Sequence, residues 1–282
     1  MSHPEKENNK SIAKENAEIF LKGYYSLSDG SKISLKTELN FSVQKSIYLK
    51  DSNFLEIDKQ LTTPAKNRQT KLEITGESTF QAAKRLRDET GENVVVLNFA
   101  SATNPGGGYL NGARAQEEDL CRTSGLYPCL TQFLDFYKFH RKQNSFLYSD
   151  RMIYSPDVPV FRDDLMSLQK KIYKISVITS AAPAMIDVPV GDTESFIQGG
   201  RALDTRIEKL LSLMLYKKYT NIILGAWGCG AFLNDPKVVS KLFQKHLMQN
   251  IKFQNKFERV TFAIRDNAKT NNKDIFLKQF GI

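Results

Sequence analysis

The chain has 282 residues and a mass of 32.1 kDa, enough for one large domain or two small ones. Hydrophobic residues make up 41% and charged residues 25% of it, an ordinary composition for a globular protein, which excludes collagen-like, fully disordered and membrane-spanning chains. The 40 Lys and Arg residues exceed the 31 Asp and Glu residues, giving a net charge of +9. This excess indicates either a polyanionic partner or general solubility alone.

Three cysteines, Cys121, Cys129 and Cys229, occur without a C-x-x-C spacing. An odd number of cysteines and no apolar leader predict free thiols in a reducing compartment, so we expect a cytoplasmic protein. The cysteines and the three histidines form no cluster with metal-ligand spacing. We therefore expect neither a metal nor a cofactor.

Residues 1–70 contain few long apolar runs and are expected to form an accessory region. The first ten residues predict a frayed tail, and apolar positions within 12–21 predict an amphipathic helix. Residues 24–50 predict turns and short strands, with Ser-Asp-Gly at 28–30 marking a hairpin. We expect this region to pack against residues 71–282.

From residue 71 onward, predicted strands alternate with predicted helices. Apolar segments predict strands at 72–75, 94–99, 175–179, 221–224 and 260–264. The intervals predict helices at about 78–88, 126–142, 196–218, 235–250 and 271–280, the first with Ser78 or Thr79 as its N-cap. This alternation is typical of an α/β sandwich with a mixed, largely parallel sheet, which binds ligands at the carboxyl ends of its strands.

Glycine-rich loops follow two of these strands. The first runs over 98–108 and ends in three glycines, which allow a backbone to approach a ligand and present N–H groups to it. The second, at 225–232, precedes a helix and has the arrangement of a phosphate cradle. Neither has the Walker or the dinucleotide-binding spacing, so an NAD-dependent dehydrogenase is disfavoured.

Two adjacent acids, Glu117 and Glu118, follow the first loop. Beside a polar glycine loop, two carboxylates can supply a general acid and an acceptor for sugar hydroxyls, as glycosidic cleavage requires. Taken in isolation, the pair is better explained as the solvated first turn of a helix, where the helix dipole favours acids.

The triplet Gly106-Gly107-Gly108 is followed, seven residues later, by Gln116-Glu117-Glu118. This signature and segments 97–101, 115–120, 155–161 and 224–232 together resemble the compact microbial branch of the poly(ADP-ribose) glycohydrolases, over about residues 12–280. The resemblance implies a macrodomain-like three-layer sandwich with an N-terminal helical accessory region, in one integrated catalytic domain. It also implies hydrolysis of the ribose–ribose O-glycosidic bonds of poly(ADP-ribose), from chain ends, with release of ADP-ribose.

The resemblance implies that Glu118 is the general acid and base of this reaction. Glu117 would hold hydroxyls of the ribose at the scissile bond, and Gln116 would position the two acids. The glycines at 106–108 would line the diphosphate and the distal ribose. Glu77 would accept a hydrogen bond from the adenine amino group, and residues 262–280 are a further candidate to cover the adenine.

The resemblance also implies that the second loop wraps the diphosphate with its amides and places an aromatic ring on the distal ribose. The residues concerned are Gly228, Cys229, Gly230, Ala231 and Phe232. Trp227 could stack on a base or belong to the core. A nucleophilic thiol at Cys229 is disfavoured, because no histidine lies near it in the sequence.

One departure concerns the first loop. Macrodomains commonly carry two asparagines three residues apart before the glycines, whereas here Asn98 is followed by Ser101 at the second position. Asn104 is a candidate to supply the missing amide.

Alternative functions on the same scaffold are a mono-ADP-ribosyl or O-acyl-ADP-ribose hydrolase and a non-catalytic ADP-ribose-binding macrodomain. The intact acid pair argues against the non-catalytic module. No nucleic-acid-binding motif occurs, so no specific nucleic-acid site is expected. The expected partners are poly(ADP-ribose) or an ADP-ribosylated protein, with ADP-ribose as product, no membrane, and a monomeric state.

Overall fold

The computed structural model describes residues 3–61, 67–268 and 270–282. Its strands are β1 (Tyr24–Ser26), β2 (Lys32–Ser34), β3 (Ile47–Leu49), β4 (Lys71–Thr75), β5 (Val94–Phe99), β6 (Met152–Arg162), β7 (Leu168–Ser180), β8 (Asn221–Leu224) and β9 (Arg259–Ala263). Its helices are α1 (His3–Lys22), α2 (Lys36–Lys45), α3 (Asp51–Gln60), α4 (Thr79–Thr90), α5 (Gln116–Thr123), α6 (Leu126–Thr131), α7 (Leu134–Gln143), α8 (Thr193–Tyr216), α9 (Pro236–Gln244) and α10 (Asn272–Phe280). Shorter turns are the 3₁₀ turns η1 (Tyr109–Asn111) and η2 (Met185–Asp187) and the π-helical turn η3 (Lys245–Gln249).

The central sheet has the strand order β3-β6-β7-β5-β8-β9-β4, and β1 and β2 form a separate antiparallel pair. From β7 to β4 each neighbouring pair is parallel, whereas β6 runs antiparallel to β7 and β3 runs antiparallel to β6. In register, Val95 of β5 lies opposite Ser176 of β7 and Ile222 of β8. The predicted mixed, largely parallel α/β sheet is confirmed.

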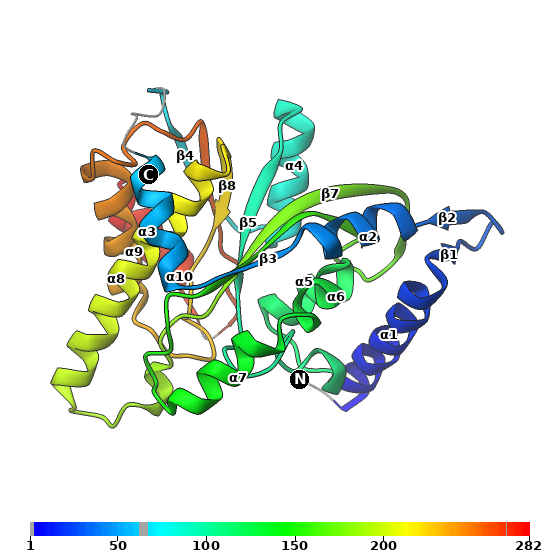
Figure 1. Ribbon diagram of the computed structural model, residues 1–282, viewed down its shortest axis with the longest axis horizontal. Coiled ribbons are helices and arrows are strands. Elements are labelled where there is room, and N and C mark those ends of the chain that lie inside the picture. Colours follow the sequence, from blue (N-terminus) through cyan, green and yellow to red (C-terminus); the bar gives the residue numbers. More distant parts are fainter. Residues whose placement is uncertain (1–2, 62–66, 269) are drawn as a thin grey trace.

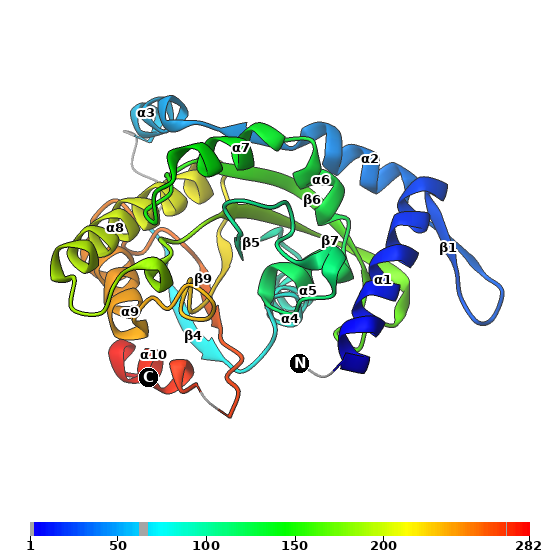
Figure 2. The ribbon, with the colours of Figure 1, turned by 90° about the horizontal axis from the view of Figure 1, so that it is seen from below.

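Helices cover both faces of this sheet, as Figure 1 and Figure 2 show. Along β5, Val95 and Leu97 pack into a cluster with residues of α3, α8, α9 and α10, whereas Val94 and Val96 pack into a cluster with residues of α4, α5, α6 and α7. A strand buried on both faces needs apolar side chains at successive positions, which explains the unbroken apolar run at 94–97. The layers are therefore helices, sheet and helices.

The expected tail at residues 1–10 is wrong for the part that the structure describes, because α1 begins at His3. Asn9 is buried, and its Nδ2 donates to the carbonyl of Gly112 at 3.2 Å, which fixes the early turns of α1 against η1. Residues 24–50, expected as turns and strands, also contain the helix α2. Only Leu39 and Ser42 of α2 are buried, so its sequence carries a weak helical pattern.

The predicted helix at 126–142 is wrong as one element, because it is divided into α6 and α7. Gln132 Nε2 donates to the Cys129 carbonyl in α6, at 3.2 Å, and to the Val43 carbonyl in α2, at 2.7 Å, and so joins the end of α6 to α2. The predicted helix at 235–250 is α-helical only to Gln244 and continues as η3. The helix predicted at 78–88 is confirmed, and Ser78 Oγ caps it by accepting from the Gln81 amide at 3.1 Å.

Part of the region at 1–70 is built into the core. β3 is an edge strand of the main sheet, and Phe54 and Ile57 of α3 pack into the cluster that contains α8. The helix α1 contacts α5 and η1 on the other side of the molecule (Figure 2). The division of the chain at residue 70 stays a prediction.

Within the described ranges 3–61, 67–268 and 270–282, no helix is long and apolar enough to cross a membrane. Within the same ranges, no group of three or more His, Cys, Asp or Glu side chains is placed to hold a metal ion. Cys121, Cys129 and Cys229 all carry free thiols.

Asn16 of α1 joins the N-terminal helix to the core. Its buried side chain donates from Nδ2 to the Arg122 carbonyl at 2.7 Å and to Tyr109 Oη at 3.3 Å, and its Oδ1 accepts from Arg162 Nε at 2.9 Å. The Asn16→Ala substitution leaves these buried groups without partners and is expected to lower the free energy of unfolding by roughly 1–3 kcal/mol. Urea denaturation measures this loss, and the exposed Lys14→Ala on the same helix should change stability by less than about 0.5 kcal/mol. Equal stabilities of the two variants would contradict the anchoring role.

Candidate active site

The helix α5 begins at Gln116, whose side-chain amide is bonded to the end of β5. Its Oε1 accepts from the Phe99 amide at 2.8 Å, and its Nε2 donates to the Leu97 carbonyl at 2.7 Å. A further bond from Nε2 to Thr79 Oγ1, at 3.0 Å, reaches the start of α4. Gln116 thereby holds the N-terminus of α5 at the carboxyl end of β5.

Glu117, the next residue, is buried with only 3% of its surface exposed. Its Oε1 accepts from Asn98 Nδ2 at 3.1 Å, and its Oε2 accepts from the Ser101 amide at 2.7 Å. Burial raises the pKa of Glu117 to about 8, the charge of Glu118 adds to the rise, and the two hydrogen bonds oppose it. Asn98 is fully buried and also donates to Thr179 Oγ1 at 3.1 Å, so its amide faces Glu117 and the sheet.

Glu118 completes the first turn of α5 and is 8% exposed. Its Oε1 accepts from the Gly108 amide at 2.8 Å. Its Oε2 is buried and has no hydrogen-bond partner among the residues that the structure describes. Because an unsatisfied buried carboxylate oxygen costs free energy, this atom is the one that gains most from a proton or a ligand.

The glycine triplet packs directly on the two acids. Gly107 has a φ of +58°, and a Cβ there would lie 2.4 Å from Glu118 Oε1 and 3.2 Å from Glu117 Oε2. At Gly108 a Cβ would lie 2.5 Å from the Cβ of Ala113. The triplet therefore shapes the acid pair, and it is not among the residues that line the adjacent cavity. Its expected contact with a diphosphate stays a prediction.

The rest of the first loop is folded on itself. Ser101 Oγ accepts from the amides of Thr103 and Asn104, at 3.3 and 3.1 Å. Asn104 is exposed, and its Nδ2 donates to Thr103 Oγ1, so it makes no contact with the acids. Gly106 lies against the ring of Tyr127, where a Cβ would be 2.9 Å from Cδ2. The serine at the second asparagine position thus stabilises the loop, and its amide holds Glu117.

A cavity of about 660 Å³ lies beside Glu117 and Glu118. Its walls come from the segments that follow β4, β5, β7, β8 and β9, together with the first turns of α4 and α5. These strands are parallel, so their carboxyl ends meet at one edge of the sheet. The cavity lies at the edge where an open α/β sheet is expected to bind its ligand.

The second loop forms one side of this cavity through Gly228, Gly230, Ala231 and Phe232. Gly228 has a φ of +74°, and a Cβ there would lie 2.5 Å from Asn234 Nδ2. Asn234 closes the loop by donating to the Gly228 carbonyl. The amides of Gly230 and Ala231 donate to no acceptor in the described parts of the chain, so they are available to an anion.

Two residues of the second loop contribute mainly to its support. Trp227 borders the cavity but is fully buried, and its Nε1 donates to the Ser180 carbonyl at 3.2 Å, so its ring is held in the core. Cys229 is not among the cavity-lining residues. Burial raises the pKa of the Cys229 thiol far above its ordinary range, which is unsuitable for a nucleophile. The burial of both residues therefore stabilises the loop.

Glu77 lies on the cavity wall and is engaged by a cation. Its Oε1 accepts from Arg85 Nε at 2.9 Å, and its Oε2 accepts from Arg85 Nη2 at 2.8 Å. These hydrogen bonds lower the pKa of Glu77, although burial opposes them. Arg85 also pairs with Glu73 at 2.8 Å. Glu77 is therefore held as a fixed acceptor at the start of α4.

Other cavity-lining residues carried no recognisable motif. Asp164, from the turn between β6 and β7, accepts from Ser78 Oγ at 2.9 Å and from Arg265 Nη2 at 2.9 Å. Arg114 lies before α5, and Asn272 begins α10. Of these further lining residues, only those within segment 262–280 were predicted from the sequence. The others were missed because the loops that contribute them are far apart in the sequence.

Comparisons with known proteins agree with this geometry. Residues 13–163 match the family model of the microbial-type PARG catalytic domain. The crystal structure of poly(ADP-ribose) glycohydrolase from Thermomonospora curvata is similar with a TM-score of 0.92 and 37% identity, covering 97% of this chain and 100% of that chain. The same enzyme bound to the inhibitor ADP-HPD has a TM-score of 0.90, 37% identity and the same coverage.

A second organism provides a similar structure. Poly(ADP-ribose) glycohydrolase from Deinococcus radiodurans, in complex with ADP-ribose, has a TM-score of 0.80 and 39% identity, covering 86% of this chain and 96% of that chain. No curated protein sequence matches the chain significantly. The acid pair at the cavity, the mixed sheet and these likenesses agree, and the chain belongs to the microbial-type poly(ADP-ribose) glycohydrolase family, as a glycosidase with that family's fold.

Proposed function

We propose that this chain hydrolyses the ribose–ribose O-glycosidic bond of poly(ADP-ribose) with Glu118 as general acid and base, and releases ADP-ribose from chain ends. The observation that carries this role is the side chain of Glu118 at the cavity wall. One oxygen is held by the Gly108 amide, and the other is buried with no hydrogen-bond partner in the described parts of the chain. A carboxyl group fixed in this way presents one free atom to a substrate.

The proposed reaction delivers its proton from Glu118 Oε2. Two adjacent buried carboxylates repel each other, so burial and repulsion together favour retention of one proton by the pair. Both oxygens of Glu117 accept from N–H donors, which fix the position of this side chain. Glu118 Oε2 has no such donor and can carry the proton without losing a hydrogen bond.

The reaction then follows in two steps. Glu118 gives its proton to the leaving ribose oxygen as the glycosidic bond breaks, and the anomeric carbon becomes oxocarbenium-like. The resulting carboxylate removes a proton from a water molecule, whose oxygen bonds to the anomeric carbon, and Glu118 is protonated again. Glu117 holds ribose hydroxyls during both steps. General acid–base assistance of this kind contributes about 10²–10⁴-fold to the rate.

Groups around the cavity fit the remainder of an ADP-ribose unit. The amides of Gly230 and Ala231 suit the diphosphate, the Phe232 ring suits the distal ribose, and Glu77 suits the adenine amino group. The complexes of the bacterial relatives with ADP-ribose and ADP-HPD support this assignment. We propose that the macrodomain-like core acts on the polymer in the cytoplasm as a monomer; the free thiols suit a reducing compartment.

Replacement of the proposed acid gives the most direct test. Glu118→Gln keeps the shape of the side chain but cannot donate the proton, so kcat on poly(ADP-ribose) should fall about 10²–10⁴-fold while ADP-ribose binding persists. The control Glu194→Gln changes an exposed acid in the first turn of α8 and should leave kcat unchanged. Release of ADP-ribose from labelled polymer measures the rate, and calorimetry measures binding. Wild-type hydrolysis by Glu118→Gln would eliminate the assignment.

The glycine triplet allows a second test. In Gly107→Ala the new methyl group displaces Glu118, and a displacement of about 1 Å at the reacting group is expected to cost about 10²-fold in kcat. Gly91→Ala introduces the same kind of backbone strain, at a φ of +70° with no atom within 4 Å of the Cβ. It should cost stability, roughly 1–2 kcal/mol, and not activity. Equal losses of kcat in both variants would show that strain alone is responsible.

The acid pair also makes stability depend on pH. Between about pH 4.5 and pH 8, the folded acid pair keeps a proton that the unfolded chain releases, as the raised pKa of Glu117 indicates, so the free energy of unfolding should decrease as pH rises. Glu117→Gln should flatten this decrease by roughly 1 kcal/mol or more over the window. Urea denaturation at several pH values gives the slope of the free energy of unfolding against pH for the wild type, Glu117→Gln and Glu194→Gln. The slope of Glu194→Gln should match that of the wild type. Identical slopes in all three proteins would refute a proton held at this site.

A further inference from the structure

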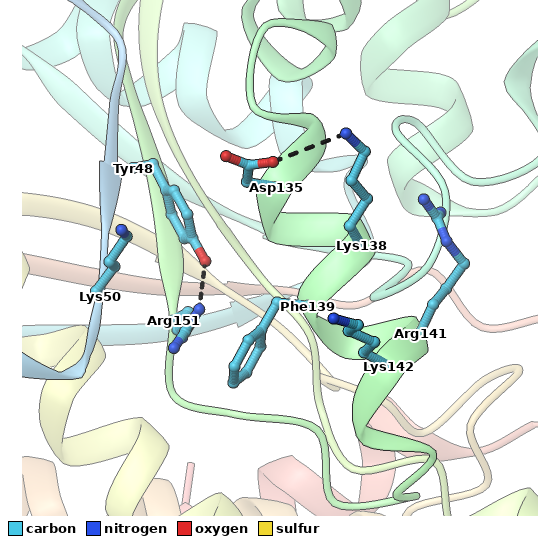
Figure 3. A pocket seen from close by; sticks show the side chains of 8 residues that line it. All are labelled: Tyr48, Lys50, Asp135, Lys138, Phe139, Arg141, Lys142 and Arg151. Carbon is cyan, nitrogen blue, oxygen red and sulfur yellow. Dashed lines mark hydrogen bonds and ion pairs between the residues drawn. The ribbon is translucent and has the colours of Figure 1, made fainter.

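A second cavity, of about 630 Å³, lies outside the acid site between α7 and the edge strand β3. Five basic side chains line it, from Lys50, Lys138, Arg141, Lys142 and Arg151. Among the described residues, Asp135 is the one acid on its wall, so the lining residues carry a net charge of +4, against +9 for the whole chain. Figure 3 shows the cations on both sides of the cavity, with Lys50 across from the lysines of α7. Such a concentration of charge in a concave site favours a polyanion.

Some of these cations bind neighbouring side chains, and others have no ion-pair partner among the described residues. Arg151 pairs with Asp51 at 3.3 Å, donates to Tyr48 Oη at 2.9 Å and lies over the Phe139 ring at 3.2 Å. By contrast, Lys50 and Lys142 are exposed and form no ion pair with any described residue, and Lys138 has only a long contact with Asp135, at 3.9 Å. The free cations therefore remain available to phosphate groups.

Two aromatic rings accompany the cations. Tyr48 and Phe139 both line the cavity and are partly exposed. Rings beside cations are the usual means of holding a nucleotide strand, because bases stack on the rings and phosphates pair with the charges. The cavity therefore suits a ligand that carries both an adenine and a diphosphate.

The second cavity is connected to the acid site through the first loop. Arg141, on its wall, donates a hydrogen bond to the Thr103 carbonyl. Two residues earlier in the same loop, Ser101 lines the acid-site cavity and its amide holds Glu117. The first loop therefore contacts residues of both cavities, and this proximity favours the enzyme's own polymer over an unrelated nucleic acid.

We propose that this basic cavity binds a diphosphate-containing unit of the same poly(ADP-ribose) chain whose end lies at Glu118. The inference rests on the proposed function, because it concerns capture of that substrate. The site increases the affinity for long chains and takes no part in bond cleavage. It acts on KM, and its contribution weakens as salt screens the charges.

The test compares substrates of two lengths with the triple variant Lys50→Glu, Lys138→Glu and Lys142→Glu. At low salt, KM for long poly(ADP-ribose) should rise about tenfold with kcat unchanged, and the salt dependence of the wild type should be largely lost. The dimer of ADP-ribose, which is expected to span the acid site alone, should be cleaved as by the wild type. The matched control, Lys218→Glu, Lys241→Glu and Lys278→Glu, makes the same change of net charge at exposed lysines of other surfaces and should behave as the wild type.

The outcomes separate the two proposals. If the wild type does not release ADP-ribose from either substrate, the proposed function fails. If it does, but the triple variant keeps the wild-type KM for long chains, only the inference about the basic cavity is overturned. Weaker binding of single-stranded RNA by the variant, with an unchanged KM for the polymer, would also overturn it in favour of a nucleic-acid ligand. Should the glutamate variant not fold, the same three positions changed to Gln give the same comparison.

Discussion

The site depends on the burial of two neighbouring carboxyl groups at the start of one short helix. Burial of acids is unfavourable, and this fold offsets the cost with donors from three places: the Ser101 amide, the Asn98 side chain and the Gly108 amide. Those donors satisfy three of the four oxygens and leave Glu118 Oε2 without a partner. Most of the cost of burying the two acids is offset, and one carboxyl oxygen still lacks a hydrogen bond. Such an oxygen suits a group that acts as an acid catalyst.

Much of the surrounding structure holds these donors in place. Gln116 ties α5 to β5, and Asn16 of the N-terminal helix bonds to the Arg122 carbonyl within α5 and to Tyr109 in η1, directly after the glycines. The accessory helix therefore supports the acid pair without contacting the cavity. The geometry of the site depends in this way on residues more than a hundred positions away in the sequence.

The sequence predicted the features that are local. The apolar run at 94–99, the capped helix after Ser78 and the acid pair are encoded in short segments, and the structure has each of these elements where they were expected. Contacts between distant segments were not predictable. Nothing local indicates that Arg85 forms hydrogen bonds with Glu77, or that Trp227 is fully buried. At the end of α6, Gln132 donates to the Val43 carbonyl. The helical pattern of residues 126–142 gives no sign of this contact with a distant segment.

The edge strand β3 has a consequence for how such enzymes diversify. Tyr48 of this strand and Lys50, which follows it, form one side of the basic cavity, whereas the acid pair belongs to α5. If the basic cavity binds polymer as proposed, catalysis and polymer binding depend on separate segments of the chain. Substitutions around β3 would then change the preferred polymer length and leave the acid pair unaltered.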